Sequence, residues 1–317
     1  MKVLLTGGAG FIGSHYCEKL LQDGHEVVIL DNFNDYYDPK IKRRNLDEVR
    51  RVGEFTLIEG DLTDAELLET IFSRHRFDAM VHLAARAGVR PSLKQPLLYE
   101  RVNVQGTIQL LDHARMQGIE RIVIASSSSV YGENEKVPFS EADPVDNPIS
   151  PYAATKKACE LIAFTYHHLY QMNITCLRFF TVYGPRQRPD MAIHKFTRLI
   201  DAGEPIPVFG DGSSRRDYTY ISDIIDGVQK SLDHCRGYHI YNLGESRTIT
   251  LSELIALIEE KLGKKAVIDR RPTQPGDVPI TYADISRARE EIGYAPQVDM
   301  AEGITEFVGW FKRVATS

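Results

Sequence analysis

The sequence predicts an α/β protein with a doubly wound parallel sheet, followed by a smaller α/β unit. In the first half, short β-branched strands alternate with longer helical segments, several strands are apolar at consecutive positions, and glycines crowd the turn after the first strand. Consecutive apolar residues suit strands that helices cover on both faces. Because strands joined by single helices require right-handed crossovers, we expect a Rossmann-like sheet.

The expected strands of this sheet span residues 3–6, 27–31, 55–59, 78–83 and 122–126. Helical patterns between them span residues 12–22, 65–75 and 97–117. Thr63 and Glu66 have the spacing of a capping box, which predicts that the second of these helices begins there.

The second half begins with a long helix expected over residues 151–171 and a strand over residues 175–180. Glycine and proline then crowd two segments, and further helices are expected over residues 223–232, 251–262 and 301–311. Thr250 and Glu253 form the capping box of the middle one. We therefore expect a cofactor-binding domain over residues 1–175 and a smaller, interleaved substrate domain over residues 176–317.

The composition excludes several classes of protein. The chain has 317 residues, of which 43% are apolar, so it is long enough to bury a full core. With 38 basic and 44 acidic residues its net charge is −6, and we expect no nucleic-acid partner. No run approaches the roughly 18 apolar residues of a membrane span, and the first residues do not resemble a secretory signal. The four cysteines are far apart, which indicates neither a metal site nor a disulfide framework, so a soluble cytoplasmic protein is expected.

The glycine-rich turn has the spacing of a dinucleotide site. Gly7, Gly10 and Gly13 lie between the first strand and the first helix, with Phe11 and Ile12 opening the helix. Missing side chains allow a tight turn, close approach of the backbone to a diphosphate, and close packing of helix on strand. The alternative is a plain glycine turn, but strand, turn and helix all lie where a dinucleotide site needs them.

Asp31 ends the second strand, near the offset expected for an acid that accepts the adenosine ribose hydroxyls. A carboxylate there repels a 2′-phosphate, so we expect NAD rather than NADP. Lys42, Arg43 and Arg44 are expected to lie too far along the next segment to reverse this preference.

Tyr152 and Lys156 form a pair at i and i+4 in the first turns of the expected long helix. Residues at this spacing share one helical face. A free phenol is a poor base at neutral pH, and a neighbouring ammonium favours its ionised form. The pair can therefore remove a proton from an alcohol while hydride leaves the same carbon. A chance surface pair is the usual alternative, and the preceding glycine turn argues against it.

Four serines, Ser126 to Ser129, stand at the carboxyl end of the fifth expected strand. Ligands of open α/β sheets bind at that edge, and a serine hydroxyl can donate to a substrate oxygen. A serine-rich loop that caps its own backbone is the alternative for one or two of them.

With these motifs the chain resembles the extended short-chain dehydrogenase/reductase family, and within it the nucleotide-sugar 4-epimerases, from Lys2 to about Phe311. The resemblance implies NAD as cofactor, Tyr152 as the base, Lys156 as its partner and Ser127 as the hydroxyl that holds the substrate O4. The residues that it places around NAD, besides Tyr152 and Lys156, are Gly7, Gly10, Phe11, Ile12, Gly13, Asp31, Asn32, Asp61, Leu62, Leu83, Ala84, Ala85 and Asn103.

Within this family, residues 32–38, 87–90 and 178–191 look like UDP-glucuronate 4-epimerases. Thr181 stands where UDP-glucose 4-epimerases usually carry Asn. Ser128 and Ser129 stand where the related 4,6-dehydratases carry Asp-Glu, and Ser129 where UDP-glucuronate decarboxylases carry Glu. The resemblance therefore implies conversion of UDP-glucuronate to UDP-galacturonate through a 4-keto intermediate. The alternatives are epimerisation of UDP-glucose/UDP-galactose or their N-acetyl forms, a net oxidoreductase or dehydratase, and a non-catalytic dinucleotide sensor.

A uronate carboxylate removed from water needs donors or a cation. Arg90, Arg186, Arg188, Ser128 and Thr181 are the candidates, and the resemblance favours Arg188 and Thr181. A solvated loop or a subunit contact is the alternative for Arg186 and Arg188, and a hydroxyl bonded to backbone is the alternative for Thr181.

The resemblance also implies how the nucleotide is held. Arg216 is expected at the UDP diphosphate, with help from Lys195 and from Arg270 or Arg271. Val208 and Phe209 are expected against uracil, and Asp277 near the uridine. A surface role is the alternative for any single arginine of this group. A homodimer is expected through the helices over residues 97–117 and 151–171, with Leu98, Val102, Ile108 and Leu111 as candidates that would equally suit an internal core.

Overall fold

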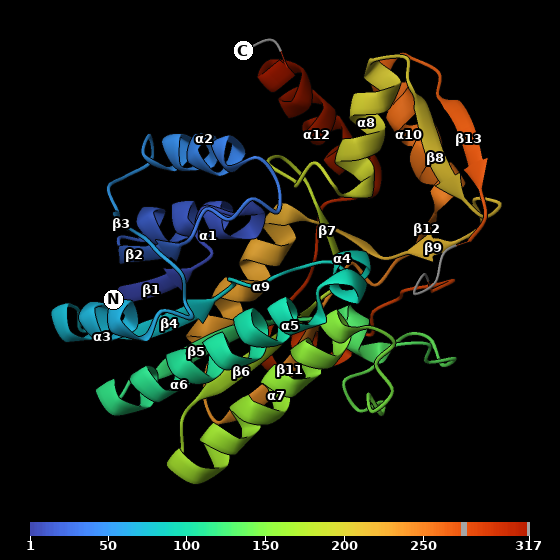
Figure 1. Ribbon diagram of the computed structural model, residues 1–317. Coiled ribbons are helices and arrows are strands. Elements are labelled where there is room, and N and C mark those ends of the chain that lie inside the picture. The colour runs from blue at the N-terminus through green and yellow to red at the C-terminus, as the bar shows by residue number, and fades with distance from the viewer. Residues whose placement is uncertain (274–277, 316–317) are drawn as a thin grey trace.

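The computed structural model describes residues 1–273 and 278–315. Its centre, among the described residues, is a seven-stranded parallel sheet with the strand order β11-β6-β5-β4-β1-β2-β3 (Figure 1). The strands of the sheet are β1 (Lys2–Thr6), β2 (Glu26–Asp31), β3 (Thr56–Glu59), β4 (Ala79–His82), β5 (Arg121–Ser127), β6 (Ile174–Phe179) and β11 (Tyr238–Leu243). The predicted parallel, doubly wound architecture is thus confirmed.

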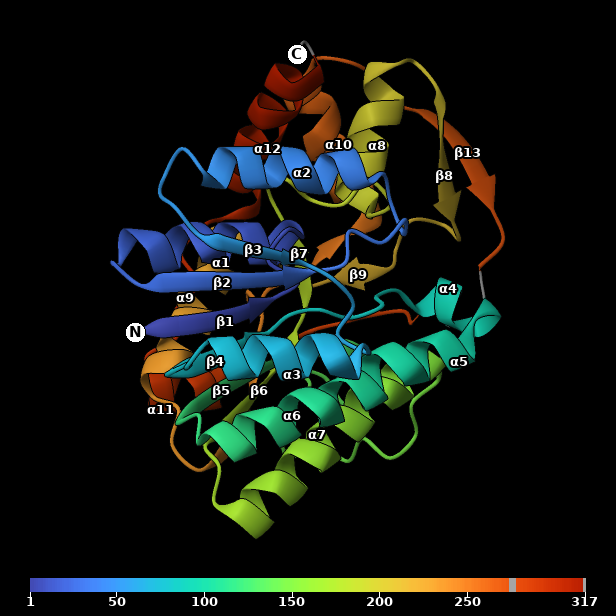
Figure 2. The same ribbon diagram turned by 60° about the vertical axis from the view of Figure 1, so that its left-hand side comes forward.

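Helices cover both faces of this sheet, as Figure 2 shows. Side chains alternate along a strand, so Leu4 packs in one core and its neighbours Val3 and Leu5 pack in the other. One face carries α1 (Phe11–Gln22), α2 (Pro39–Val49), α9 (Ile221–Asp233) and α11 (Ser286–Ile292). The other carries α3 (Ala65–Arg74), α6 (Gly106–Gln117) and α7 (Pro151–Tyr170).

Two local predictions in the first half need correction. Asp64, not Thr63, caps α3, because its carboxylate accepts from the Leu67 N–H at 3.1 Å, while the Thr63 hydroxyl donates to Asp61 at 2.7 Å. The helix expected over residues 97–117 is broken into α5 (Pro96–Tyr99), a π-helical turn (Glu100–Gln105) and α6. The π turn contains Asn103, whose buried side chain makes tertiary hydrogen bonds, and such turns are frequent at functional sites.

A second group of elements, yellow to red in Figure 1, packs around its own apolar core. It contains α8 (Ala192–Asp201), α10 (Leu251–Leu262), α12 (Met300–Ala315) and the parallel pair β8 (Pro205–Phe209) and β13 (Val267–Arg271). The Thr250–Glu253 capping box of α10 is confirmed. The chain does not stay in this group, because β11 returns to the edge of the central sheet beside β6.

Short elements connect the two groups. They are α4 (Val89–Lys94), the 3₁₀ turn (Ser128–Tyr131), the parallel pair β7 (Thr181–Tyr183) and β10 (Tyr218–Tyr220), and the antiparallel pair β9 (Arg215–Arg216) and β12 (Ile249–Thr250). They gather near the carboxyl ends of the central strands, where ligands of such sheets bind. No helix among the described residues is long and apolar enough to cross a membrane.

Candidate active site

The turn between β1 and α1 is closed by contacts that only glycine permits. Gly7 has a φ of +72°, and a Cβ there would lie 2.8 Å from the Ala84 nitrogen. A Cβ at Gly13 would lie 2.1 Å from the Gly7 carbonyl oxygen. Gly10 is the N-cap of α1 and supplies no side-chain cap. The first N–H groups of α1 are therefore left for an anion, as the spacing predicted.

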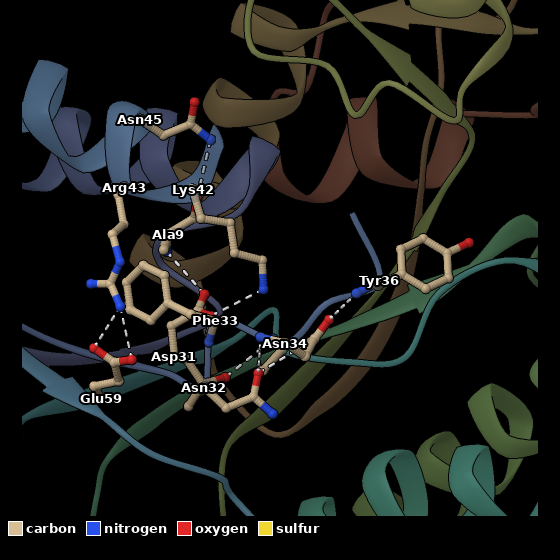
Figure 3. A network of polar contacts seen from close by, with 12 residues as sticks. Ala9, Asp31, Asn32, Phe33, Asn34, Tyr36, Lys42, Arg43, Asn45 and Glu59 are labelled. Atoms are coloured by element: carbon tan, nitrogen blue, oxygen red, sulfur yellow. Dashed lines mark hydrogen bonds and ion pairs between the residues drawn. The ribbon is translucent and has the colours of Figure 1, made fainter. Parts of the chain in front are cut away.

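Asp31, at the end of β2, is the centre of a buried network (Figure 3). One carboxylate oxygen accepts from the Phe33 N–H at 2.9 Å and from Lys42 Nζ at 3.2 Å, and the other accepts from the Ala9 N–H at 3.2 Å. Lys42 was expected to lie too far along the chain to reverse the preference for NAD, and its distance was misjudged, because it pairs with Asp31 at 3.2 Å; this pair does not contradict the expected preference. Helix α2 runs back over the sheet and buries the Lys42 ammonium against the carboxylate, with side chains 7% and 5% exposed.

The loop after β2 continues this network. The Asn32 amide donates to Asp61 at 2.8 Å, and the Asn32 oxygen accepts from the Asn34 N–H at 3.0 Å. Burial alone would raise the pKa of Asp61, but hydrogen bonds from Thr63 and Asn32 outweigh it and hold this pKa below its ordinary value. Asp61 is thus an ionised anchor for the loop that carries Asn32, and it does not line the cavity described below.

Tyr152 and Lys156 lie in the first turns of α7, where the Ser150 hydroxyl caps the helix by accepting from the Ala153 N–H at 3.1 Å. The Lys156 side chain is buried, and its Nζ donates to the Ala125 carbonyl at 2.7 Å. An ammonium has three donors, so this bond leaves two for other partners. Tyr152 meets the edge of the Tyr99 ring at a centroid distance of 6.2 Å.

The Ser127 hydroxyl accepts from both the Ser129 N–H at 3.2 Å and the Ser129 hydroxyl at 2.9 Å. Because its oxygen already accepts from two donors, its own proton is available for donation. The expectation that one or two serines satisfy the local backbone therefore holds for the Ser129–Ser127 contact. Ser126 lines both cavities, and its hydroxyl donates to buried Glu160 at 2.6 Å.

A buried hydrogen-bond chain supports the strand ends on which these groups stand. The Thr107 hydroxyl donates to the Asn103 carbonyl at 2.5 Å and therefore accepts from His82 Nε2 at 3.1 Å, which leaves His82 Nδ1 to accept from Thr6 at 2.7 Å. Burial, together with the charge of Lys156, lowers the pKa of His82 to about 3. His82 is thus a neutral side chain that connects its own strand β4 to β1 and α6 by hydrogen bonds.

Two adjoining cavities collect most of the predicted site residues. The first is lined by the glycine turn and by the other predicted cofactor residues except Asp61 and Asn103: Gly7, Gly10, Phe11, Ile12, Gly13, Asp31, Asn32, Leu62, Leu83, Ala84, Ala85, Tyr152 and Lys156. Asn103 does not line this cavity but supports its wall, because its amide donates to the Arg86 carbonyl and to the Thr155 hydroxyl, both at 3.1 Å. The second is lined by the predicted substrate residues Arg90, Ser127, Ser128, Ser129, Thr181, Arg188 and Arg216. Tyr152 and Arg188 line both cavities.

Other predicted substrate residues lie elsewhere. Val208 is 2% exposed and packs in the core of the second group, whereas Phe209 lies under the Arg90 guanidinium at 4.7 Å. Lys195 does not line the second cavity. Arg271 does not line it either, and it pairs with Asp269. The remaining predicted residue, Asp277, lies outside the described residues, as do its neighbours 274–276.

Asp217, the neighbour of Arg216 in sequence, is the centre of another buried network. Asp217 is fully buried and accepts from the N–H groups of Glu245 at 2.8 Å, Ser246 at 3.1 Å and Ala283 at 3.1 Å. Burial raises the pKa of Asp217 to about 6, although these hydrogen bonds act in the opposite direction. The carboxylate thus joins three backbone segments next to the arginine that lines the second cavity.

Arg186 has a role that neither of its expected ones describes. It is 7% exposed, lines neither cavity, and pairs with Glu18 of α1 at 2.5 Å and Glu48 of α2 at 2.8 Å. Its φ of +65° is rare for a non-glycine residue. The two ion pairs fix this conformation and clamp the loop that carries Arg188 against the first cavity's helices.

Sequence reasoning missed several lining residues of the first cavity, among them Lys42, Tyr36 and Arg86. Lys42 lies in a helix rich in charged residues, on the face that also buries Asn45, Leu46 and Val49. Its spacing from these buried positions is the signal that could have placed it over the strand end. Arg86 donates to Asn34 at 3.2 Å and lies over the Tyr36 ring at 5.7 Å, and its Nε is buried without a hydrogen-bond partner among the described residues. Nothing local in the sequence marks that contact.

The donors and acceptors of the first cavity fit NAD. The uncapped N-terminus of α1 suits a diphosphate, and the Asp31 carboxylate suits ribose hydroxyls. Tyr152 lines both cavities, and Lys156 lines the first. The close contacts at Gly7 and Gly13 show that the turn has no room for side chains, which leaves its backbone exposed to a ligand.

Comparisons with known proteins agree with this site. A UDP-glucuronate 4-epimerase of Thermodesulfobacterium geofontis is 44% identical over 98% of this chain and 95% of its own length. UDP-glucuronate 4-epimerase 1 of Arabidopsis thaliana is 47% identical over 98% of this chain and 76% of its own. The crystal structure of a Bacillus cereus UDP-glucuronic acid 4-epimerase with UDP-glucuronic acid and NAD superposes with a TM-score of 0.92 at 34% identity, covering 99% and 100% of the two chains.

A Thermotoga maritima UDP-glucose 4-epimerase with UDP-glucose is similar as well, with a TM-score of 0.91 at 33% identity over 99% and 100% of the two chains. The family model described as GDP-mannose 4,6 dehydratase matches residues 4–307, nearly the whole chain. The predicted resemblance to the extended short-chain dehydrogenases/reductases is confirmed, and the chain belongs to the GDP-mannose 4,6 dehydratase family within them.

Proposed function

We propose that the protein is an NAD-dependent UDP-sugar 4-epimerase that interconverts UDP-glucuronate and UDP-galacturonate. The observation that carries this proposal is the position of Tyr152, which lies on the wall shared by a dinucleotide-shaped cavity and a second cavity lined by serines and arginines. In this proposal the part of the chain up to residue 175 holds the cofactor, and residues 176–317 form the substrate domain, which contributes Thr181, Arg188 and Arg216 to the second cavity.

Each residue of the pair on α7 has a separate task. Tyr152 accepts the O4 proton of the sugar and later returns it, and Ser127 donates its free proton to the same oxygen. Lys156 is held by the Ala125 carbonyl and directs its remaining donors and its charge toward the phenol and the cofactor ribose. Bound NAD supplies reversible hydride acceptance at C4, so the reaction is an isomerisation with no net oxidant.

The uronate is favoured by the groups that line the second cavity. Thr181, Ser128 and Arg188 all line it and can meet a C6 carboxylate with hydroxyl and guanidinium donors. Ser128 and Ser129 leave the cavity without the paired acids that the resemblance associates with dehydration. The relatives named as UDP-glucuronate 4-epimerases support the same choice.

A second candidate is epimerisation of UDP-glucose and UDP-galactose. The similar T. maritima structure holds UDP-glucose, which favours this candidate. Incubating the holoenzyme with each UDP-sugar and following the products by NMR separates the two. The proposal predicts UDP-galacturonate from UDP-glucuronate, with faster turnover than UDP-glucose, and it is overturned if only UDP-glucose reacts.

The role of Tyr152 is tested with Tyr152→Phe, which removes only the phenol oxygen. General acid–base groups contribute about 10²–10⁴ in rate, so we expect a loss of this size with NAD content unchanged. Tyr170→Phe, in the exposed last turn of the same helix, is the matched control and keeps wild-type turnover.

We also propose a homodimer through the exposed face of α6 and α7. Leu161, Phe164, Tyr170 and Met116 are between 48% and 62% exposed. Of the residues expected in contact, Leu111 is fully buried in the core, whereas Ile108 is 36% exposed. Light scattering of the wild type and of Phe164→Glu tests this, since a charge in an apolar interface is expected to yield monomers. A wild-type monomer overturns it.

A further inference from the structure

The guanidinium of Arg188 is already bound by a carboxylate of its own chain. Arg188 Nε lies 3.0 Å from Asp190 Oδ1, and Nη2 lies 3.0 Å from Oδ2, which is a two-point ion pair. Burial by itself would lower the pKa of Arg188 and raise that of Asp190, but their mutual hydrogen bonds and charges outweigh it in both cases. The pKa of Arg188 is raised and that of Asp190 is lowered, so both groups are charged at neutral pH.

Arg188 and Asp190 differ in their position relative to the two cavities. Arg188 lines both cavities, whereas Asp190 lines neither and lies behind the guanidinium. The Tyr36 hydroxyl, from the loop after β2, donates to Asp190 Oδ2 at 3.4 Å, and the Arg188 guanidinium lies over the Tyr36 ring at 5.4 Å. The Asp190 carboxylate is thus held by Arg188 on one side and by the Tyr36 hydroxyl on the other, outside both cavities.

A guanidinium binds a carboxylate best with two parallel N–H groups. In Arg188 the edge formed by Nε and Nη2 is occupied by Asp190, so a ligand carboxylate meets the other edge, formed by Nη1 and Nη2, of a cation whose charge is already offset. During epimerisation at C4 the sugar must present both faces to the cofactor, and its C6 carboxylate must move each time. A guanidinium with both edges and its full charge available would hold that carboxylate more tightly and slow the turn.

We propose that Asp190 is a specificity-determining residue that competes with the substrate carboxylate for Arg188. It thereby lowers the affinity of Arg188 for a uronate, so that the carboxylate is released when the sugar turns. This inference rests on the proposed function. It assigns to Asp190 a negative contribution to binding of uronates and no contribution to binding of neutral UDP-sugars.

The test is Asp190→Asn, which keeps the shape and removes the charge. Affinities of the NAD-loaded protein for UDP-glucuronate and UDP-glucose are measured by calorimetry, together with KM and kcat. We expect Kd and KM for UDP-glucuronate to fall about tenfold and kcat to fall by a similar factor, with the values for UDP-glucose within about twofold of wild type. Asp47→Asn, which removes the partner of exposed Arg50, is the matched control.

Arg188→Met provides the second arm. If Asp190 acts through Arg188, Asp190→Asn has no further effect on uronate binding in the Arg188→Met background. Equal changes for the two sugars, or weaker uronate binding in Asp190→Asn, overturn the inference. Asp190→Ser replaces Asp190→Asn if the latter does not fold.

The calorimetry separates this inference from the proposed function. A wild type that binds UDP-glucuronate but does not epimerise it contradicts the proposed function alone, because the selective gain in affinity is measured without turnover.

Discussion

Arg178 and Glu160 form a two-point ion pair in the interior, directly beneath the serine loop. Arg178 Nε donates to Glu160 Oε1 at 2.9 Å and Nη2 donates to Oε2 at 2.9 Å, and both side chains are 1% exposed. Burial alone would lower the pKa of Arg178, but its hydrogen bonds and charge interaction with Glu160 raise it. Ser126 donates to the same carboxylate, and Arg178 Nη1 donates to the Tyr131 hydroxyl at 3.0 Å. The pair therefore joins β5, β6 and α7 next to Ser127.

Breaking this pair from one side is expected to be costly. Arg178→Met leaves the buried Glu160 carboxylate with only the Lys157 ammonium, 3.6 Å from Oε2, and the Ser126 hydroxyl, which lowers the free energy of unfolding by about 3 kcal/mol. Urea denaturation measures the loss. The double variant Arg178→Met/Glu160→Leu removes both charges and is expected to recover most of it. A double variant as unstable as the single one would mean that the hydrogen bonds of the network, and not the isolated charge, determine the effect.

Asp31 and Lys42 are expected to set the choice of cofactor together. Asp31→Asn removes the carboxylate that repels a 2′-phosphate and leaves the Lys42 ammonium in the cavity wall. A charge-assisted hydrogen bond is worth about 2 kcal/mol, so the ratio of NADP to NAD affinity is expected to rise roughly thirtyfold. Fluorescence titration with each dinucleotide measures both affinities. Adding Lys42→Met to Asp31→Asn is the control that removes the gain for NADP, and persistence of the gain would contradict the assignment.

The glycine turn offers a matched pair of substitutions. Gly7 and Gly24 have φ values of +72° and +75°, but a Cβ at Gly7 would lie 2.8 Å from the Ala84 nitrogen, while one at Gly24 meets nothing within 4 Å. Both Gly→Ala variants incur the cost of the left-handed conformation, about 1–2 kcal/mol. We expect Gly7→Ala to lose further stability and most NAD binding, and Gly24→Ala to keep its cofactor. Thermal melts with and without NAD compare the two variants. Equal losses of stability and of NAD binding would show that the structure relieves the contact between the new Cβ and the Ala84 nitrogen.

His82 makes stability depend on pH. In the unfolded chain an ordinary histidine gains a proton below about pH 6.5, whereas His82 stays neutral in the fold until its pKa of about 3. The unfolded state therefore binds more protons in this window, and the stability present above it is lost as the pH falls. From about pH 7 to about pH 5, His82→Gln is expected to lose about 2 kcal/mol less than the wild type.

Urea denaturation at the two pH values measures this difference, with exposed His168→Gln as the control for the substitution itself. A wild-type slope in His82→Gln would assign the acid sensitivity to other groups, such as half-buried His15, whose pKa is also lowered to about 3 by burial and by the charge of Arg186.

Much of the fold followed from local patterns. Apolar strands, the glycine turn and the Thr250 capping box each depend on residues close in sequence, and they lie where they were expected. Local patterns were insufficient where a tertiary contact competed with them. Asp61 engages the Thr63 hydroxyl, so Asp64 caps α3, and the buried bonds of Asn103 accompany a π turn in a segment that reads as one helix.

The chain by itself determined the glycine turn, the Tyr152–Lys156 pair on α7 and the serine loop, because each is a short motif whose spacing fixes which groups share a strand end or a helical face. Only the tertiary structure decided which charges meet: Lys42 with Asp31, Arg186 with Glu18 and Glu48, Arg178 with Glu160. These partners lie on different elements, and packing of the helices over the sheet brings them together. Even Asp190, two positions from Arg188, is held behind it by a tyrosine from a distant loop. Charge pairing depends on distances of a few ångströms in space, which separation along the sequence does not specify.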